Sequence, residues 1–169
     1  MDIVIARLVH IFAGTFWIGA GTLSILIIHP YGKKILQQGD RAIEAFYSKS
    51  NWSRYLAINA VLTVLAGLYL YFRLSDGFTL SWLSQAGMTV LAIGSVAGVL
   101  CMIHGGAFVG RLQGQMGKFA AQIQDNPTSE QRSQLAAMTK TLEMHTYINF
   151  GLALIAVIGM ASARHIHLL

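Results

Sequence analysis

Apolar residues along the chain fall into four long runs that are separated by polar stretches. The runs cover about residues 3–28, 55–74, 84–109 and 143–163. Each run reaches the roughly 20 residues that a helix needs to cross a hydrocarbon core about 30 Å thick. The first run follows almost no positive segment and lacks a small-residue cleavage site, which argues against a signal peptide. The pattern therefore predicts an integral membrane protein with four transmembrane helices.

The connections between the runs carry signals of their own. Pro30 is expected to end the first helix and to bias His29 away from helical geometry. Residues 40–56 are predicted to form a short amphipathic helix before the second run. Trp52 lies in that segment, at the level expected for an interfacial aromatic belt. A turn is expected at residues 75–77, in the short connection to the third run.

The helical pattern of the third run continues beyond its apolar part to about residue 124. Asn126 is expected to cap the next helix, with Pro127 at its first position. These segments predict a helical hairpin that projects about 20 Å from the membrane, at 1.5 Å per residue. The expected fold class is all-α, an up-down four-helix transmembrane bundle in a single domain over residues 1–169, with a cytoplasmic helical protrusion. Its helices are expected at about 3–28, 55–74, 84–124 and 128–163.

Composition and charge refine this interpretation. Charged residues make up only 11% of the chain, whereas a soluble domain carries about 25%. Most basic residues lie in the two long connections, at Lys33, Lys34, Arg41, Lys49, Arg54, Arg111, Lys118, Arg132 and Lys140. By the positive-inside rule, these connections face the cytoplasm, and both termini lie on the outer, periplasmic side of the cytoplasmic (inner) membrane. The lipid bilayer accounts for the basic residues through its anionic headgroups, so no nucleic-acid partner is expected.

Four of the six histidines fall inside the apolar runs or at their ends, at His10, His29, His104 and His145. Ionisable residues inside a membrane are costly and are functional candidates by default. Imidazole suits this setting because it can stay neutral and still offer a ring nitrogen to iron or copper. The sequence therefore points to metal or cofactor binding at these histidines.

The first of these histidines belongs to a stripe on one face of the first helix. His10, Gly14, Trp17, Gly21 and Ser24 are spaced by alternating steps of four and three residues. The glycines would leave open volume beside the histidine for a flat macrocycle, and the indole could stack on the edge of that macrocycle. The alternative is a helix–helix interface, because glycine stripes let membrane helices approach closely.

Two further histidines are expected at matching depth on neighbouring antiparallel helices. His104 and His145 lie near the cytoplasmic face, and Asn149 lies one turn deeper than the second of them. This is the arrangement that two axial ligands of a b-type haem need, and His29 could replace either partner. His10 is about 28 Å from His29 along a helix, so it would belong to a second site.

A copper site is the alternative reading of the same region. Cys101, Met102 and Met144 lie close in sequence to the two histidines, and soft ligands suit Cu(I). No Met-x-x-Met or Cys-x-x-Cys spacing supports it. The single cysteine also excludes a disulfide framework within the chain.

The stretch HIFAGTFWIGAG at residues 10–21 resembles the first-helix pattern His-x6-Trp-x-Gly of small four-helix membrane proteins. These include the oxygen-independent protoporphyrinogen oxidase and copper-resistance D families. The resemblance implies b-type haem binding with His10 as a ligand. The chain departs from the oxidase pattern because LSILIIHP stands where those proteins carry Leu-Pro-Arg, and no lysine lies within an apolar run.

The function expected from these features is a b-type haem-binding membrane protein with a redox or electron-transfer role. It would hold one or two haems and exchange electrons with quinone, and it would act alone, as a homo-oligomer or with other membrane subunits. The alternative is a copper-handling protein or a non-catalytic small subunit of a larger respiratory complex, in which the glycine faces are packing seams.

Overall fold

The computed structural model of the chain describes residues 1–37, 46, 50–123 and 127–168. Within these ranges the chain forms helices and turns, with no strand. Four helical stretches are long and apolar enough to cross a membrane, at Asp2–Gly32, Trp52–Leu74, Met88–Gln122 and Ser129–Ile166. The predicted all-α chain with four long apolar helices is thereby confirmed.

The first long stretch does not end at its proline. Helix α1 (Asp2–Leu23) passes through the π-helical turn η1 (Ser24–Ile28) into α2 (His29–Gln37). The expectation that Pro30 ends the helix is therefore wrong, and His29 has helical angles, φ −67° and ψ −48°. A proline inside a regular helix removes a hydrogen bond and crowds the preceding turn. Here the N–H of His29 donates to the carbonyl of Ser24, five residues back, so the wider turn accommodates the proline.

The second long stretch is α4 (Trp52–Leu74), which begins three residues earlier than the second apolar run. The predicted amphipathic helix at 40–56 falls mostly outside the described residues. The predicted turn at 75–77 is confirmed, and Gly77 adopts a positive φ of 79° there. A short 3₁₀ helix, η2 (Leu80–Ser84), then leads to the next membrane-length helix.

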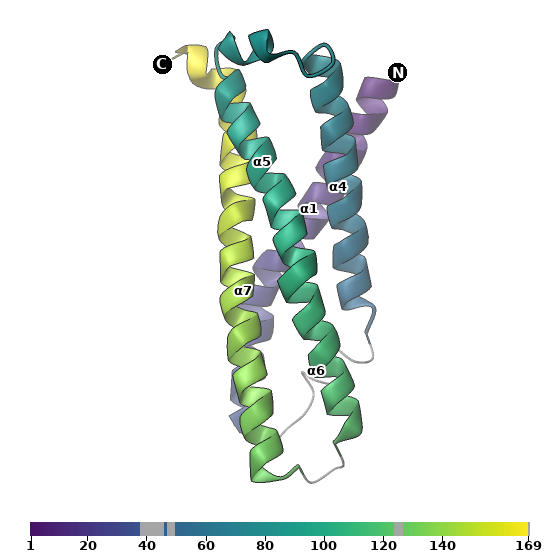
Figure 1. Cartoon of the computed structure of the whole chain (residues 1–169), viewed down its shortest axis with the longest axis vertical. Helices are drawn as coiled ribbons and strands as arrows, with labels where there is room; N and C mark the ends of the chain where they lie inside the picture. The colour runs from purple at the N-terminus through teal and green to yellow at the C-terminus, as the bar shows by residue number, and fades with distance from the viewer. Residues whose placement is uncertain (38–45, 47–49, 124–126, 169) are drawn as a thin grey trace.

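The third long stretch consists of α5 (Met88–His104), the π-helical segment η3 (Gly105–Gly110) and α6 (Arg111–Gln122). It runs without a break, as the periodicity of the sequence predicted. Figure 1 shows α6 continuing past the level at which α4 begins. Its buried face carries Met116, which packs with Val109 and Leu142 in an apolar cluster.

The last long helix is α7 (Ser129–Ser162), followed by the 3₁₀ turn η4 (Ala163–Leu168). Its N-cap is Thr128, so the assignment of Asn126 as the cap is wrong. The Thr128 hydroxyl accepts from the N–H of Gln131, and the Gln131 side chain accepts from the N–H of Thr128. This capping box satisfies two end donors at once, which a cap at 126 would leave open.

The four long stretches pack as two antiparallel pairs. Helix α1 lies along α4 and α5 lies along α7, whereas the two pairs contact each other less extensively. Both termini and the connection from α4 to α5 lie at one end of the molecule (Figure 1). In the α5/α7 pair the backbones come close together, because a Cβ built at Gly159 would lie 2.8 Å from the Cα of Gly94. Small residues allow such an approach between membrane helices.

Candidate functional site

His104 and His145 contact each other directly across the α5/α7 seam. The Nδ1 atom of His145 lies 3.2 Å from Nε2 of His104, and the ring centroids are 5.3 Å apart. On its other side, Nδ1 of His104 lies 3.2 Å from Oδ1 of Asn149. Phe108, one turn after His104, stacks on His145 with centroids 4.7 Å apart and ring planes 11° apart. The structure therefore brings together three of the residues predicted for this site.

If both rings are neutral, this chain of contacts determines which ring nitrogens carry hydrogen. The amide oxygen of Asn149 can only accept, so with the amide in this orientation Nδ1 of His104 is protonated. A neutral ring then leaves Nε2 of His104 as an acceptor, and the donor to it is Nδ1–H of His145. The remaining nitrogen, Nε2 of His145, keeps its lone pair and makes no hydrogen bond to any described residue. The network thus leaves one imidazole nitrogen available to a ligand.

His10 reaches a similar state by a different route. Its Nδ1 lies 2.7 Å from the backbone carbonyl oxygen of Thr63 on α4. A carbonyl only accepts, so Nδ1 carries the hydrogen and Nε2 keeps the lone pair in the neutral ring. The ring occupies the space that Gly67 leaves by having no side chain, since a Cβ there would lie 2.8 Å from the ring atom Cε1.

The stripe predicted around His10 divides into two parts with different surroundings. Gly14 is buried in the seam with α4, where a Cβ would lie 3.4 Å from the Thr63 methyl group. Trp17, Gly21 and Ser24 instead line a cavity. The glycine at 14 thus lies in a helix-packing seam, whereas the one at 21 borders open space.

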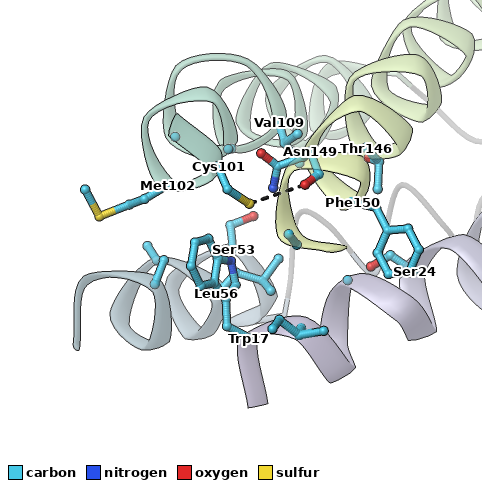
Figure 2. A pocket seen from close by; sticks show the side chains of 18 of the residues that line it. Trp17, Ser24, Ser53, Leu56, Cys101, Met102, Val109, Thr146, Asn149 and Phe150 are labelled. Atoms are coloured by element: carbon cyan, nitrogen blue, oxygen red, sulfur yellow. Dashed lines mark hydrogen bonds between the residues drawn. The ribbon is translucent and has the colours of Figure 1, made fainter. Parts of the chain in front are cut away.

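The cavity lies between the two helix pairs (Figure 2). Its volume is about 190 Å³, and all four long helical stretches contribute to its wall. Both π-helical segments border it, η1 through Ser24 and η3 through Gly105, Gly106, Val109 and Gly110. Because a π-turn widens a helix, these segments keep the neighbouring helices from closing the space. Figure 2 shows Cys101 and Asn149 close together at one side, joined by the 3.3 Å hydrogen bond from Sγ to the Asn149 carbonyl oxygen.

The cavity wall also holds a polar pair that the sequence analysis did not single out. Gln113 at the start of α6 is only 2% exposed, and its Oε1 accepts a 2.7 Å hydrogen bond from the Ser53 hydroxyl. Gln113 shares the buried face of α6 with Met116, Gly117 and Ala120. A glutamine inside an apolar stripe was the signal in the sequence that could have revealed it.

The other predicted ligands have surroundings of their own. His29 is buried, with 6% of its surface exposed, where η1 passes into α2. Cys101 is buried and bonded to the Asn149 backbone. Among the described residues, no group of three or more His, Cys, Asp or Glu side chains comes close enough to hold a metal ion.

Comparison of the chain with protein-family models, with curated proteins and with solved structures finds no match. The function is therefore inferred from the geometry of these residues.

Proposed function

We propose that this chain is a multi-pass membrane protein that binds b-type haem through His10 and His145 and takes part in electron transfer. The observation that carries the proposal is the shared state of the two rings. In each, Nδ1 lies within hydrogen-bond distance of an acceptor in the chain, which in a neutral ring leaves the lone pair of Nε2 for a ligand. Histidines that bind metals usually donate their other N–H in this way, because the bond fixes the tautomer and the ring orientation.

The geometry favours one ligand from the histidine pair rather than two. Axial ligands bind the iron from opposite faces of the macrocycle, so the macrocycle must fit between them. His104 and His145 instead share a 3.2 Å hydrogen bond, and nothing fits between the bonded nitrogens. In the proposal His145 is the ligand, and His104 positions it while its own Nδ1–H donates to Oδ1 of Asn149.

The proposed haem sites are separate from the cavity. Neither His10 nor His145 lines it, and its 190 Å³ falls below the roughly 300–1,000 Å³ of pockets for drug-sized ligands. Three apolar side chains beside His145 are about half-exposed, those of Phe108, Met144 and Ile148. Apolar surroundings of this kind suit a macrocycle, and the protein sets the iron potential through ligand identity and burial.

A bound b-type haem would supply one-electron chemistry at its iron. His10 and His145 would hold and orient it. His10 lies in the N-terminal half of α1, near one end of the molecule, and His145 lies at the middle of α7. Two such sites would allow electrons to cross the bilayer.

The proposed membrane arrangement follows the charge distribution of the chain. The four long helices would cross the cytoplasmic membrane in up-down order, with both termini on the outer side. The hairpin of α6 and the first turns of α7 would then lie in the cytoplasm. The described basic residues of that hairpin, including Arg111, Lys118, Arg132 and Lys140, are exposed, which suits a surface facing anionic lipid and water.

The test is the reduced-minus-oxidised visible spectrum of the detergent-purified full chain, with a pyridine haemochrome assay to count haems. We expect a b-type α-band, and we expect His10→Ala and His145→Ala each to remove part of the haem. His165→Ala is the control, because His165 is exposed and bonded only to its neighbour Arg164. A colourless protein from haem-replete cells, or a haem content that neither substitution lowers, would overturn the proposal.

A further inference from the structure

The cavity between the helix pairs offers hydrogen-bond donors but no charge. None of the residues that line it is Asp, Glu, Lys, Arg or His. Most of its wall is apolar, with Leu56, Val61 and Phe150 among the larger side chains. The helices that form it are apolar enough to span a membrane. A ligand suited to this space is therefore neutral and soluble in lipid.

In two side-chain amides of the wall, the oxygen accepts a hydrogen bond within the protein and the nitrogen does not donate one. Oδ1 of Asn149 is bonded to His104 and Oε1 of Gln113 is bonded to Ser53. No described residue accepts a hydrogen bond from either amide nitrogen. Gln113 is almost fully buried, so its NH₂ group cannot turn to bulk water. An amide donor at the wall of an apolar cavity is stabilised by an acceptor, so a ligand that carries acceptor oxygens suits this wall.

The hydroxyl groups in the wall have the complementary arrangement. Ser24 donates its hydrogen to the Ala20 carbonyl, and Thr146 donates to the Leu142 carbonyl. Their oxygens therefore remain able to accept. A ligand that alternates between carbonyl and hydroxyl oxygens would find donors in one state and acceptors in the other.

We propose that this cavity binds the head group of a membrane quinone, with its carbonyl oxygens accepting from the amide nitrogens of Gln113 and Asn149. The volume of about 190 Å³ suits a single substituted ring. The isoprenoid tail would leave between the two helix pairs, where packing is less extensive. A lipid acyl chain would fill the apolar part but would leave both amides without acceptors.

The inference deepens the proposed redox function by assigning its lipid-soluble partner. Only the exchange of electrons between haem and quinone rests on that function. Binding itself can be measured whether or not the protein carries haem. Trp17 lines the cavity, so a bound quinone should quench its fluorescence. The probe is decylubiquinone, added to the detergent-purified full chain, with Trp17→Phe to identify the responding indole.

Gln113→Leu should weaken quenching by decylubiquinone about threefold to tenfold, the range for one hydrogen bond between neutral groups. Gln115→Leu is the matched control, because Gln115 is exposed on the same helix. A second pair of variants tests the cavity without changing Gln113. A Cβ at Gly21 or Gly19 meets no atom within 4 Å, but only Gly21 lines the cavity. Gly21→Leu should abolish binding, whereas Gly19→Leu should retain it.

Equal affinities across both pairs would overturn the inference, as would unchanged quenching in Trp17→Phe. Competition by decylbenzene, which has the ring and chain but no acceptor oxygen, would also overturn it and would indicate an acyl chain as the occupant. Haem content is measured on the same samples. Quinone binding to a protein without haem would keep this site and overturn the haem proposal. If the protein carries haem but Gln113→Leu and Gln115→Leu bind quinone equally, the haem proposal stands and the quinone site is overturned.

Discussion

The two helix pairs use glycine at their closest approach for different purposes. In the α5/α7 pair, Gly94 and Gly159 face each other so closely that a Cβ on either would meet backbone atoms of the partner helix at about 3 Å or less. In the α1/α4 pair, Gly67 faces not a backbone but the ring of His10. The first arrangement brings two helices together, whereas the second makes room for a side chain.

This difference separates packing glycines from glycines that serve a histidine. A helix pair gains van der Waals contact from the first kind. The second kind lets His10 reach the Thr63 carbonyl, and so sets which ring nitrogen keeps its lone pair. The α5/α7 pair sets the state of His145 by side chains instead, through His104 and Asn149. One histidine is thus held by the backbone and the other by a chain of side chains.

The largest effect is expected from a substitution at the packing contact. Gly159→Ala would place a Cβ 2.8 Å from the Cα of Gly94, so the two helices must move apart. Overpacking of this kind costs about 1–3 kcal/mol, and a contact between two backbones should lie at the upper end. The thermal midpoint of the detergent-purified protein measures it. Gly151→Ala on the same helix is the control, because its Cβ would meet no atom within 4 Å. Equal midpoints for the two variants would contradict a tight α5/α7 contact.

A smaller loss of stability is expected from a substitution at Gly67, beside the His10 ring, but its effect on haem binding should be more selective. In Gly67→Ala the new Cβ would lie 2.8 Å from Cε1 and 2.9 Å from Nδ1 of His10, so the ring must leave its position. We expect the loss of one hydrogen bond, about 0.5–1.5 kcal/mol, and of the haem assigned to His10. Haem at His145 should remain, as a pyridine haemochrome count on Gly67→Ala and His145→Ala would show. Gly19→Ala, which meets no neighbour, should retain both haems. Loss of both haems in Gly67→Ala would show that the sites are not independent.

The sequence predicted the parts of the molecule that depend on local pattern. The four apolar helices and the helical continuation into α6 follow from hydrophobic periodicity. The end of the first helix could not be predicted, because Pro30 is accommodated by a π-turn that begins six residues earlier. The cap of α7 was misplaced because a single capping residue was considered rather than the reciprocal pair of Thr128 and Gln131.

The candidate site was predictable by residue type but not by arrangement. Helix depth alone brought His104, His145 and Asn149 to one level, and the structure places them in contact. The depth of a residue along its helix does not determine whether two rings contact each other or lie across a gap, because that depends on the rotation of each helix about its axis. The cavity depends on how the two helix pairs pack against each other, which the sequence of a single helix does not predict. Gln113, a polar residue in an apolar stripe, was a local signal of it that the sequence offered.

The smallest effect expected is at the side-chain network, and a pair of adjacent glycines isolates it. A Cβ at Gly105 would lie 3.2 Å from Nδ2 of Asn149, whereas a Cβ at Gly106 would meet nothing within 4 Å. Alanine in place of a helical glycine gains up to about 1 kcal/mol from propensity alone. Gly106→Ala should show that gain, and Gly105→Ala should show less, because the amide must shift away from its position.

The same shift would lengthen the 3.2 Å contact between Asn149 and His104, and His145 would follow. We therefore expect Gly105→Ala to change the reduction potential of the haem assigned to His145 and to leave the one at His10 unchanged, since Thr63 holds His10 without any link to Asn149. A redox titration of both variants measures this. Equal potentials in Gly105→Ala and Gly106→Ala would mean that the network does not reach the haem. A change at His10 would mean that the two helix pairs are coupled through the cavity between them.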